Sequence, residues 1–237
     1  MPQGRRARYV RRVSNAPRLA VFGDIHANLP ALDAVLEAIA DSGITHGIIT
    51  GDIVLRGLQP EKCVTRARKT GWPCVEGNTD RRVVGKKVKP KTNPRDMRPG
   101  TRTWTKTMLS QKSLDWLDGL PAMVEANLGP HRVVAVHGDQ TVPPGMVDHG
   151  ADDHQIIATM DALGADVLIT AHTHSPMLRW VDGRLVVNPG SVGEGTADDQ
   201  RPSWAWLEAG DNGIHAAIEH VDAALAPPRD SAHRKGE

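Results

Sequence analysis

The chain has 237 residues, of which 39% are hydrophobic and 24% are charged, as in ordinary globular proteins and unlike disordered ones. Its net charge of +1 provides no global field for holding nucleic acid or anionic lipid. Two cysteines are too few for a disulfide framework or a zinc cluster, and no apolar run is long enough to span a membrane. An enzyme or a binding domain remains, which we expect in the cytoplasm because the basic N-terminus lacks the apolar stretch of a signal peptide.

Composition divides the chain into three segments. Residues 1–17 are rich in arginine and poor in apolar residues, so we expect a mobile basic tail. Residues 223–237 are polar and interrupted by prolines, and we expect a disordered tail. Residues 18–222 are expected to form one domain.

The first half of this domain alternates between apolar strands and helices. Asn28 offers a helix cap, Pro30 an early helical position and Gly43 a helix end. The expected strands are 19–22, 47–50 and 73–76, and the expected helices are 28–43 and 60–69.

A basic loop separates the two halves. Residues 85–102 carry seven lysines and arginines among three prolines, and their role is open. After it we expect helices within 104–120 and 152–163, strands 133–136 and 167–170, and hairpins over 178–188 and 204–221. Parallel units in front and hairpins behind predict a layered α/β domain with two sheets.

Polar clusters follow the carboxyl ends of five of the expected strands, where open α/β sheets place their ligands. Seven side chains with metal-ligating atoms should therefore converge, namely Asp24, His26, Asp52, Asn78, His137, His172 and His174. Imidazole and oxygen donors without thiolate suit Mn, Fe, Zn, Co or Ni. Seven ligands exceed the three or four of one catalytic zinc, whereas two ions about 3.5–4 Å apart that share a carboxylate would use them all.

Each of these motifs taken alone is weaker evidence for a metal site than all of them together. About 0.5 His-x-His motifs are expected by chance in a chain with this histidine content. Gly51-Asp52 and Gly77-Asn78 are common in turns and helix caps, and His137 alone could be a hydrogen-bonded core histidine. Five coincidences at strand ends favour the metal site.

Six motifs follow one another in a fixed order over residues 18–222: Gly23-Asp24-x-His26, Gly51-Asp52, Gly77-Asn78-Thr79-Asp80, Val136-His137-Gly138, His172-x-His174 and Asn188-Pro189-Gly190-Ser191. This series resembles the calcineurin-like metallophosphoesterases, and most closely their small bacterial and archaeal phosphodiesterase branch. The resemblance implies a four-layer α-β-β-α sandwich, with two mixed sheets flanked by helices and a dinuclear centre at the sheet edges.

The resemblance also implies a division of the ligands between two divalent ions. Asp24, His26 and His174 would hold one ion; Asn78, His137 and His172 would hold the other; Asp52 would bridge them. Manganese is the first choice of metal, with Fe, Zn, Ni or Co as alternatives. Catalysis is assigned to the same centre, through Asp52, Asn78 and His137, with a hydroxide between the ions as the nucleophile.

The chain departs from many members of that family at one position. They carry a histidine after the motif asparagine, where this chain has Thr79, and threonine cannot act as a general acid near neutral pH. The small phosphodiesterase branch is similar to this chain in lacking that histidine. Substrate contacts are assigned to Thr79, Arg81 and His149, although surface-exposed Arg81 and His149 side chains are the simpler reading.

A hydroxide nucleophile without a dedicated acid favours leaving groups that need little protonation, so we expect a phosphodiesterase acting on a small phosphodiester or nucleotide. Alternatives are a phosphomonoesterase or protein phosphatase on the same centre, and a non-catalytic protein-binding scaffold of this fold. We expect no membrane association and no stable nucleic-acid partner, because the net charge is near zero and no recognition element is evident. A homo-oligomer stays open.

Overall fold

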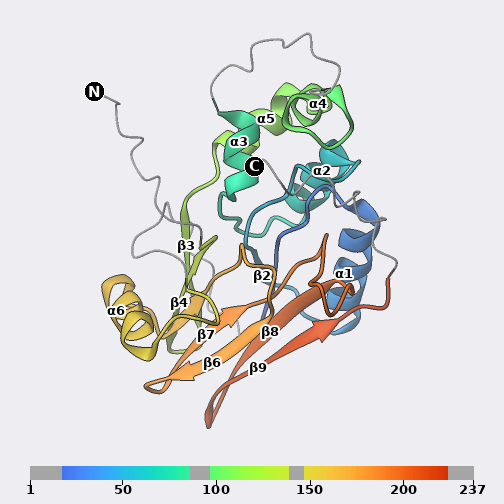
Figure 1. Cartoon of the computed structure of the whole chain (residues 1–237). Coiled ribbons are helices and arrows are strands. Elements are labelled where there is room, and N and C mark those ends of the chain that lie inside the picture. The colour runs from blue at the N-terminus through green and yellow to red at the C-terminus, as the bar shows by residue number, and fades with distance from the viewer. Residues whose placement is uncertain (1–17, 86–96, 139–146, 224–237) are drawn as a thin grey trace, which may run out of the picture.

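The computed structural model describes residues 18–85, 97–138 and 147–223 (Figure 1). The strands are β1 Arg18–Phe22, β2 Gly47–Ile49, β3 Met123–Leu128, β4 His131–Val136, β5 Val167–Ile169, β6 Met177–Val181, β7 Arg184–Asn188, β8 Ser203–Gly210 and β9 Gly213–His220. The helices are α1 Leu29–Asp41, α2 Pro60–Lys69, α3 Asn78–Val84, α4 Arg102–Thr107, α5 Gln111–Asp118 and α6 Asp153–Leu163. The predicted tail 1–17, the predicted tail 223–237 except for Ala223, and residues 86–96 of the basic loop lie outside the described residues.

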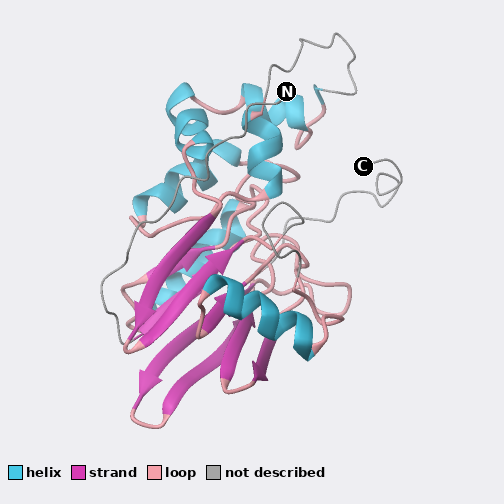
Figure 2. Ribbon diagram, turned by 90° about the vertical axis from the view of Figure 1, so that its left-hand side faces the viewer, coloured by secondary structure: helices cyan, strands magenta, loops and turns pink. Residues whose placement is uncertain are grey.

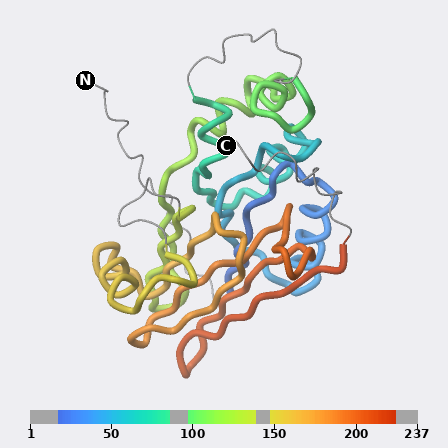
Figure 3. Tube along the Cα trace, viewed as in Figure 1, coloured from blue at the N-terminus to red at the C-terminus, as the bar shows by residue number. Residues whose placement is uncertain are grey.

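The strands form two mixed sheets. One has the order β2-β1-β8-β9, in which β1 is parallel to β2 and antiparallel to β8. The other has the order β3-β4-β5-β7-β6, with parallel pairs at its centre and antiparallel hairpins at its edges. The last hairpin, β8 and β9, which runs from orange to red in Figure 3, pairs with β1 through β8 and completes the first sheet.

Three apolar cores separate four layers, and the alternation of side chains along the strands produces them. In β1, Leu19 and Val21 point into the core between the sheets, whereas Phe22 points into the core beneath α1 and α2. In β4, Val133 faces the other sheet and Val134 faces α6. Helices therefore cover the outer face of each sheet (Figure 2), and the predicted α-β-β-α sandwich is confirmed.

One local expectation needs correction, and two elements were not expected. Residues 73–76 are extended but form only an isolated bridge, Ile49 with Cys74, because Pro73 has no N–H to donate. Strand β3, which pairs antiparallel with β4, was not expected, and neither was helix α3, which begins at Asn78 itself. Among the described residues, no helix has the length and hydropathy needed to cross a membrane.

Candidate metal centre

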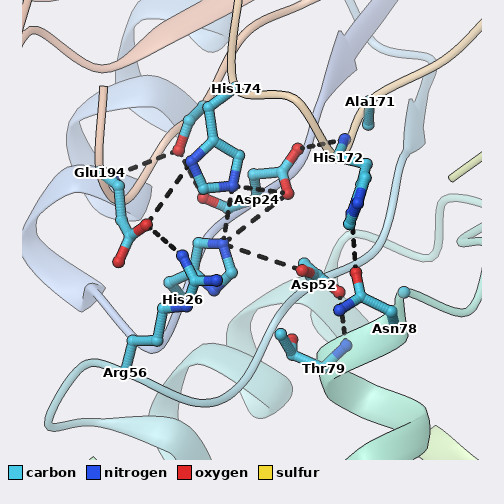
Figure 4. A network of polar contacts seen from close by, with 12 residues as sticks. Asp24, His26, Asp52, Arg56, Asn78, Thr79, Ala171, His172, His174 and Glu194 are labelled. Atoms are coloured by element: carbon cyan, nitrogen blue, oxygen red, sulfur yellow. Dashed lines mark hydrogen bonds and ion pairs between the residues drawn. The ribbon is translucent and has the colours of Figure 1, made fainter. Parts of the chain in front are cut away.

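The predicted ligands lie together beyond the ends of the strands, and Figure 4 labels all of them except His137. Asp24 and His26 follow β1, and Asp52 follows β2. His137 follows β4, and both His172 and His174 follow β5. Asn78 is the first residue of α3. Side chains from five places in the sequence therefore meet where the strands end.

The first ligand group consists of Asp24, His26 and His174, whose ligand atoms all lie within 4.8 Å of one another. The Nε2 atoms of His26 and His174 are 3.0 Å apart. The Oδ1 atom of Asp24 is 3.2 Å from Nε2 of His174 and 3.7 Å from Nε2 of His26. Three donor atoms thus face one small space.

The second ligand group consists of Asp52, His137 and His172, which meet the same distance criterion of 4.8 Å. The amide oxygen of Asn78 joins them, at 3.0 Å from Nε2 of His137 and 2.9 Å from Nδ1 of His172. The donor set is therefore two imidazoles, one carboxylate and one amide oxygen.

Asp52 lies between the two groups and presents one oxygen to each. Its Oδ1 is 3.4 Å from Nε2 of His137, and its Oδ2 is 3.8 Å from Nε2 of His26. The backbone N–H of Thr79, in the first turn of α3, donates to Oδ1 at 2.8 Å and fixes the carboxylate. A carboxylate placed in this way can bridge two cations.

The residues present fit divalent ions. Oδ1 of Asp24 is fully buried and accepts no hydrogen bond of good geometry, although Nε2 of His174 lies 3.2 Å away, and a cation beside both atoms would satisfy this oxygen. His26 and His174 direct ring nitrogens at each other, an arrangement typical of two ligands of one ion. Nitrogen and oxygen donors without thiolate suit borderline divalent metals.

The pKa values of Asp24 and His26 are shifted toward the protonation states that bind metal, whereas the carboxylates hold a positive charge on His137 that a cation would replace. Burial raises the pKa of Asp24, but the neighbouring histidines, His174 first, outweigh burial and hold it below its usual value, so the carboxylate is ionised. Burial lowers the pKa of His26, and the charges of His174 and Arg56 lower it further, so its imidazole is neutral, as a ligand must be. For His137 burial lowers the pKa, but the carboxylates of Asp52 and Asp24 raise it overall. The site therefore attracts positive charge.

Five of the seven predicted ligands have left-handed backbone conformations. Their φ angles lie between 48° and 69°, for Asp24, His26, Asp52, His172 and His174. Non-glycine residues rarely adopt this region, and strain of this kind gathers at functional sites, where the surrounding structure maintains it. Close backbone packing contributes, since a Cβ on Gly77 would lie 2.1 Å from the backbone nitrogen of Asp52.

Hydrogen bonds behind the ligands set their orientation. Nδ1 of His137 lies 2.8 Å from the carbonyl oxygen of Thr50 and donates to it, so Nε2 is the nitrogen left for a metal. The backbone N–H of His172 donates to Oδ2 of Asp24 at 3.2 Å, which ties the loop after β5 to the loop after β1.

Asp80 is buried and anchors the loop that carries Asp52. Its Oδ1 accepts hydrogen bonds from the backbone N–H groups of Ile53 and Val54, and its Oδ2 accepts from that of Gly77. Burial raises the pKa of Asp80, and the charge of Asp52 raises it further. Asp80 thus joins the segment after β2 to the start of α3.

In the structure, the three residues that the sequence assigned to substrate contacts are either paired with other groups or exposed. The Thr79 side chain is buried, and its hydroxyl donates to the carbonyl oxygen of Val54 at 2.9 Å. Arg81 pairs with Glu76 at 3.1 Å. His149 is exposed in a turn, and within the described part of the chain it belongs to neither ligand group.

An ion pair at the rim of the site was missed from the sequence. Arg56 donates from Nη1 to Oε2 of Glu194, and the same oxygen is 3.5 Å from Nδ1 of His174 (Figure 4). Arg56 and Glu194 are 138 positions apart in the sequence, and neither belongs to a motif. The sequence offers one hint only, which is that Arg56 follows Asp52 by four residues in the same loop.

This fold and this cluster of ligands define a family of metal-dependent phosphoester hydrolases, and the chain belongs to it: residues 18–212 match the calcineurin-like phosphoesterase superfamily domain. It is 31% identical over 201 residues to the uncharacterized protein MJ0912 of Methanocaldococcus jannaschii, covering 74% of this chain and 76% of that protein. A metallophosphoesterase from Sphaerobacter thermophilus superposes with a TM-score of 0.71 at 28% identity, over 89% of this chain and 90% of that one. Hypothetical protein PH1004 of Pyrococcus horikoshii shares the fold, with a TM-score of 0.73, 21% identity and coverage of 87% and 88%. The predicted family is confirmed.

Proposed function

We propose that this chain is a dinuclear metal-dependent phosphodiesterase that hydrolyses small phosphodiesters or nucleotides. The observation that carries the proposal is the position of Asp52, whose two oxygens face His137 at 3.4 Å and His26 at 3.8 Å. A pair of ligand groups joined by one carboxylate is the arrangement of two-metal hydrolases.

The ligands would be divided as the motifs imply. Asp24, His26 and His174 would hold one ion, and Asn78, His137 and His172 the other, with Asp52 shared. Bound divalent ions, Mn²⁺ first and Fe, Zn, Ni or Co next, would lower the pKa of water and polarise the phosphoryl oxygen. The Thr50 carbonyl and the Thr79 N–H hold His137 and Asp52 in place before substrate arrives.

The preference for diesters follows from the surroundings of Thr79. Its hydroxyl is turned to the Val54 carbonyl and cannot protonate a leaving group. His149 and His154 are exposed, and no described contact brings either to the ligand groups. Without a general acid, leaving groups of low pKa are favoured, and aryl diesters are expected to react before alkyl monoesters.

The test compares bis-p-nitrophenyl phosphate with p-nitrophenyl phosphate and with an alkyl phosphomonoester, for the full chain supplied with Mn²⁺. We expect kcat/KM to be higher for the diester. A higher value for either monoester contradicts the diester preference and supports a phosphomonoesterase on the same centre. Binding of no divalent ion, measured by elemental analysis, contradicts the enzyme and supports a protein-binding scaffold.

A further inference from the structure

The segment after β7 is fixed against the loop that carries the first ligand group. Both the hydroxyl of Ser191 and the N–H of Gly193 donate to the carbonyl oxygen of Asp24, each at 2.9 Å. The N–H of Glu194 in turn donates to the Ser191 hydroxyl at 3.1 Å. A Cβ on Gly193 would lie 2.1 Å from the carbonyl oxygen of Ile25, so the two backbones are in direct contact. Glu194 is therefore held at a defined place beside Asp24.

From that place Glu194 reaches the far side of a ligand. Its Oε2 is 3.5 Å from Nδ1 of His174, while Nε2 of the same ring faces Asp24 and His26 (Figure 4). Arg56 donates to the same carboxylate oxygen and holds it toward the ring. The His174 side chain is 15% exposed and that of Glu194 is 34% exposed, so this contact closes the rim of the site.

The two ligand groups differ in what lies behind one of their imidazoles, at the ring nitrogen that points away from the site. In the second group the remote nitrogen of His137 contacts a neutral backbone carbonyl, that of Thr50. In the first group the remote nitrogen of His174 faces a carboxylate. A carboxylate behind a metal-binding imidazole orients the ring and makes its other nitrogen more basic, and loss of such a partner typically lowers metal affinity about 10–100-fold.

We propose that Glu194, anchored by Arg56, is a positioning residue for His174 that raises the affinity of the first ligand group for a divalent ion and leaves the second group unaffected. This inference rests on the proposed dinuclear centre, and it goes beyond it by assigning a residue that acts on one of the two ions only.

The test is calorimetric titration of the metal-free full chain with Mn²⁺ alone, which needs no substrate. Glu194→Gln keeps the size of the side chain and removes its charge. Asp199→Asn is the matched control, because Asp199 lies in the same segment, is similarly exposed at 31% and pairs with Arg201 at 2.7 Å. We expect Glu194→Gln to weaken one of two Mn²⁺ sites by at least about 10-fold and Asp199→Asn to change neither by more than about twofold.

Two background variants assign the effect to a ligand group. In His137→Ala, which impairs the second group, Glu194→Gln should still weaken Mn²⁺ binding. In His26→Ala, which impairs the first group, Glu194→Gln should have no further effect. The opposite pattern contradicts the inference.

The remaining outcomes separate this inference from the proposed function. A wild-type chain that binds two Mn²⁺ ions, with unchanged affinities in Glu194→Gln, overturns the role of Glu194 alone. Equal weakening of both sites overturns it as well, because it indicates a general structural role. A wild-type chain that binds no pair of ions overturns both proposals.

Discussion

The carboxylate of Asp52 is held from one side and open to the ligands on the other. It is 2% exposed, and the Thr79 N–H fixes Oδ1 while both oxygens remain directed at the two ligand groups. An amide at this position would have a single oxygen and no charge, so it could not bridge two cations. The consequence can be measured.

Asp52→Asn is expected to lower diester turnover by at least about 10³-fold, which corresponds to about 4 kcal/mol of lost transition-state stabilisation. The bound Mn²⁺ should fall below two ions per chain in elemental analysis. Asp33→Asn, which alters an exposed ion pair with Arg66, serves as the control and should retain both activity and metal. Full activity in Asp52→Asn would show that the carboxylate does not bridge.

The Thr79 hydroxyl has a structural partner and should matter for stability rather than for catalysis. Thr79→Val leaves the buried carbonyl of Val54 without its donor, at a cost of about 1–3 kcal/mol, or a Tm lower by roughly 2–4 °C per kcal/mol. Diester kcat should stay within about threefold of wild type, and Thr79→Ser should retain the Tm. A large loss of kcat at unchanged Tm would instead assign the hydroxyl to the substrate.

At the scale of elements, the sequence predicted the strands and helices with strong periodicity and missed two others. Helix α3 has few apolar positions, with Val83 its buried anchor, and it is stabilised by packing against α4 and α5 that no local pattern reveals. Strand β3 alternates correctly, since Val124, Ala126 and Leu128 are buried, and that alternation was the signal that could have identified it.

Helices α2 and α5 are connected by one carboxylate. Glu61 accepts hydrogen bonds from the N–H of Ser110 at 2.9 Å and from the hydroxyls of Ser110 at 3.0 Å and Ser113 at 2.9 Å. Partial burial opposes ionisation of Glu61, but these hydrogen bonds outweigh it and hold its pKa below the ordinary value of 4.5. The ionised form is therefore favoured by folding.

Glu61→Gln is expected to destabilise the protein by about 1 kcal/mol near neutral pH. Because the folded pKa is depressed, this contribution is present above about pH 4.5 and is lost as the pH falls through the folded pKa. Urea unfolding of the wild type and of Glu61→Gln between about pH 7 and pH 3.5 should show that their difference in free energy of unfolding decreases as the pH falls. A constant difference would mean that the charge of Glu61 contributes nothing.

At the scale of the whole molecule, strand-end position and residue type were sufficient to predict which side chains gather, because parallel strands bring their carboxyl ends to one edge. The left-handed backbone at the ligands and the pairing of Arg56 with Glu194 could not be predicted. Both features depend on contacts between loops that are far apart in the sequence, and no periodic pattern in a single sequence reveals such contacts.

A centre made of buried carboxylates and imidazoles should stabilise the whole fold when filled. Saturating Mn²⁺, at about 100 times the dissociation constant, contributes about 2.7 kcal/mol per site and should raise the Tm of the metal-free chain by roughly 11–22 °C for two sites. Differential scanning calorimetry with and without Mn²⁺ measures this. Asp24→Asn, which removes a ligand of the first group, should show a smaller rise, whereas an equal rise would indicate binding elsewhere.

Anomalous diffraction at the manganese edge, from crystals of the full chain grown with Mn²⁺, locates the ions directly. We predict two peaks about 3.5–4 Å apart, one beside Asp24, His26 and His174, the other beside Asn78, His137 and His172, with Asp52 touching both. Peaks remote from these side chains, or a single peak at full Mn²⁺ occupancy, would contradict this prediction.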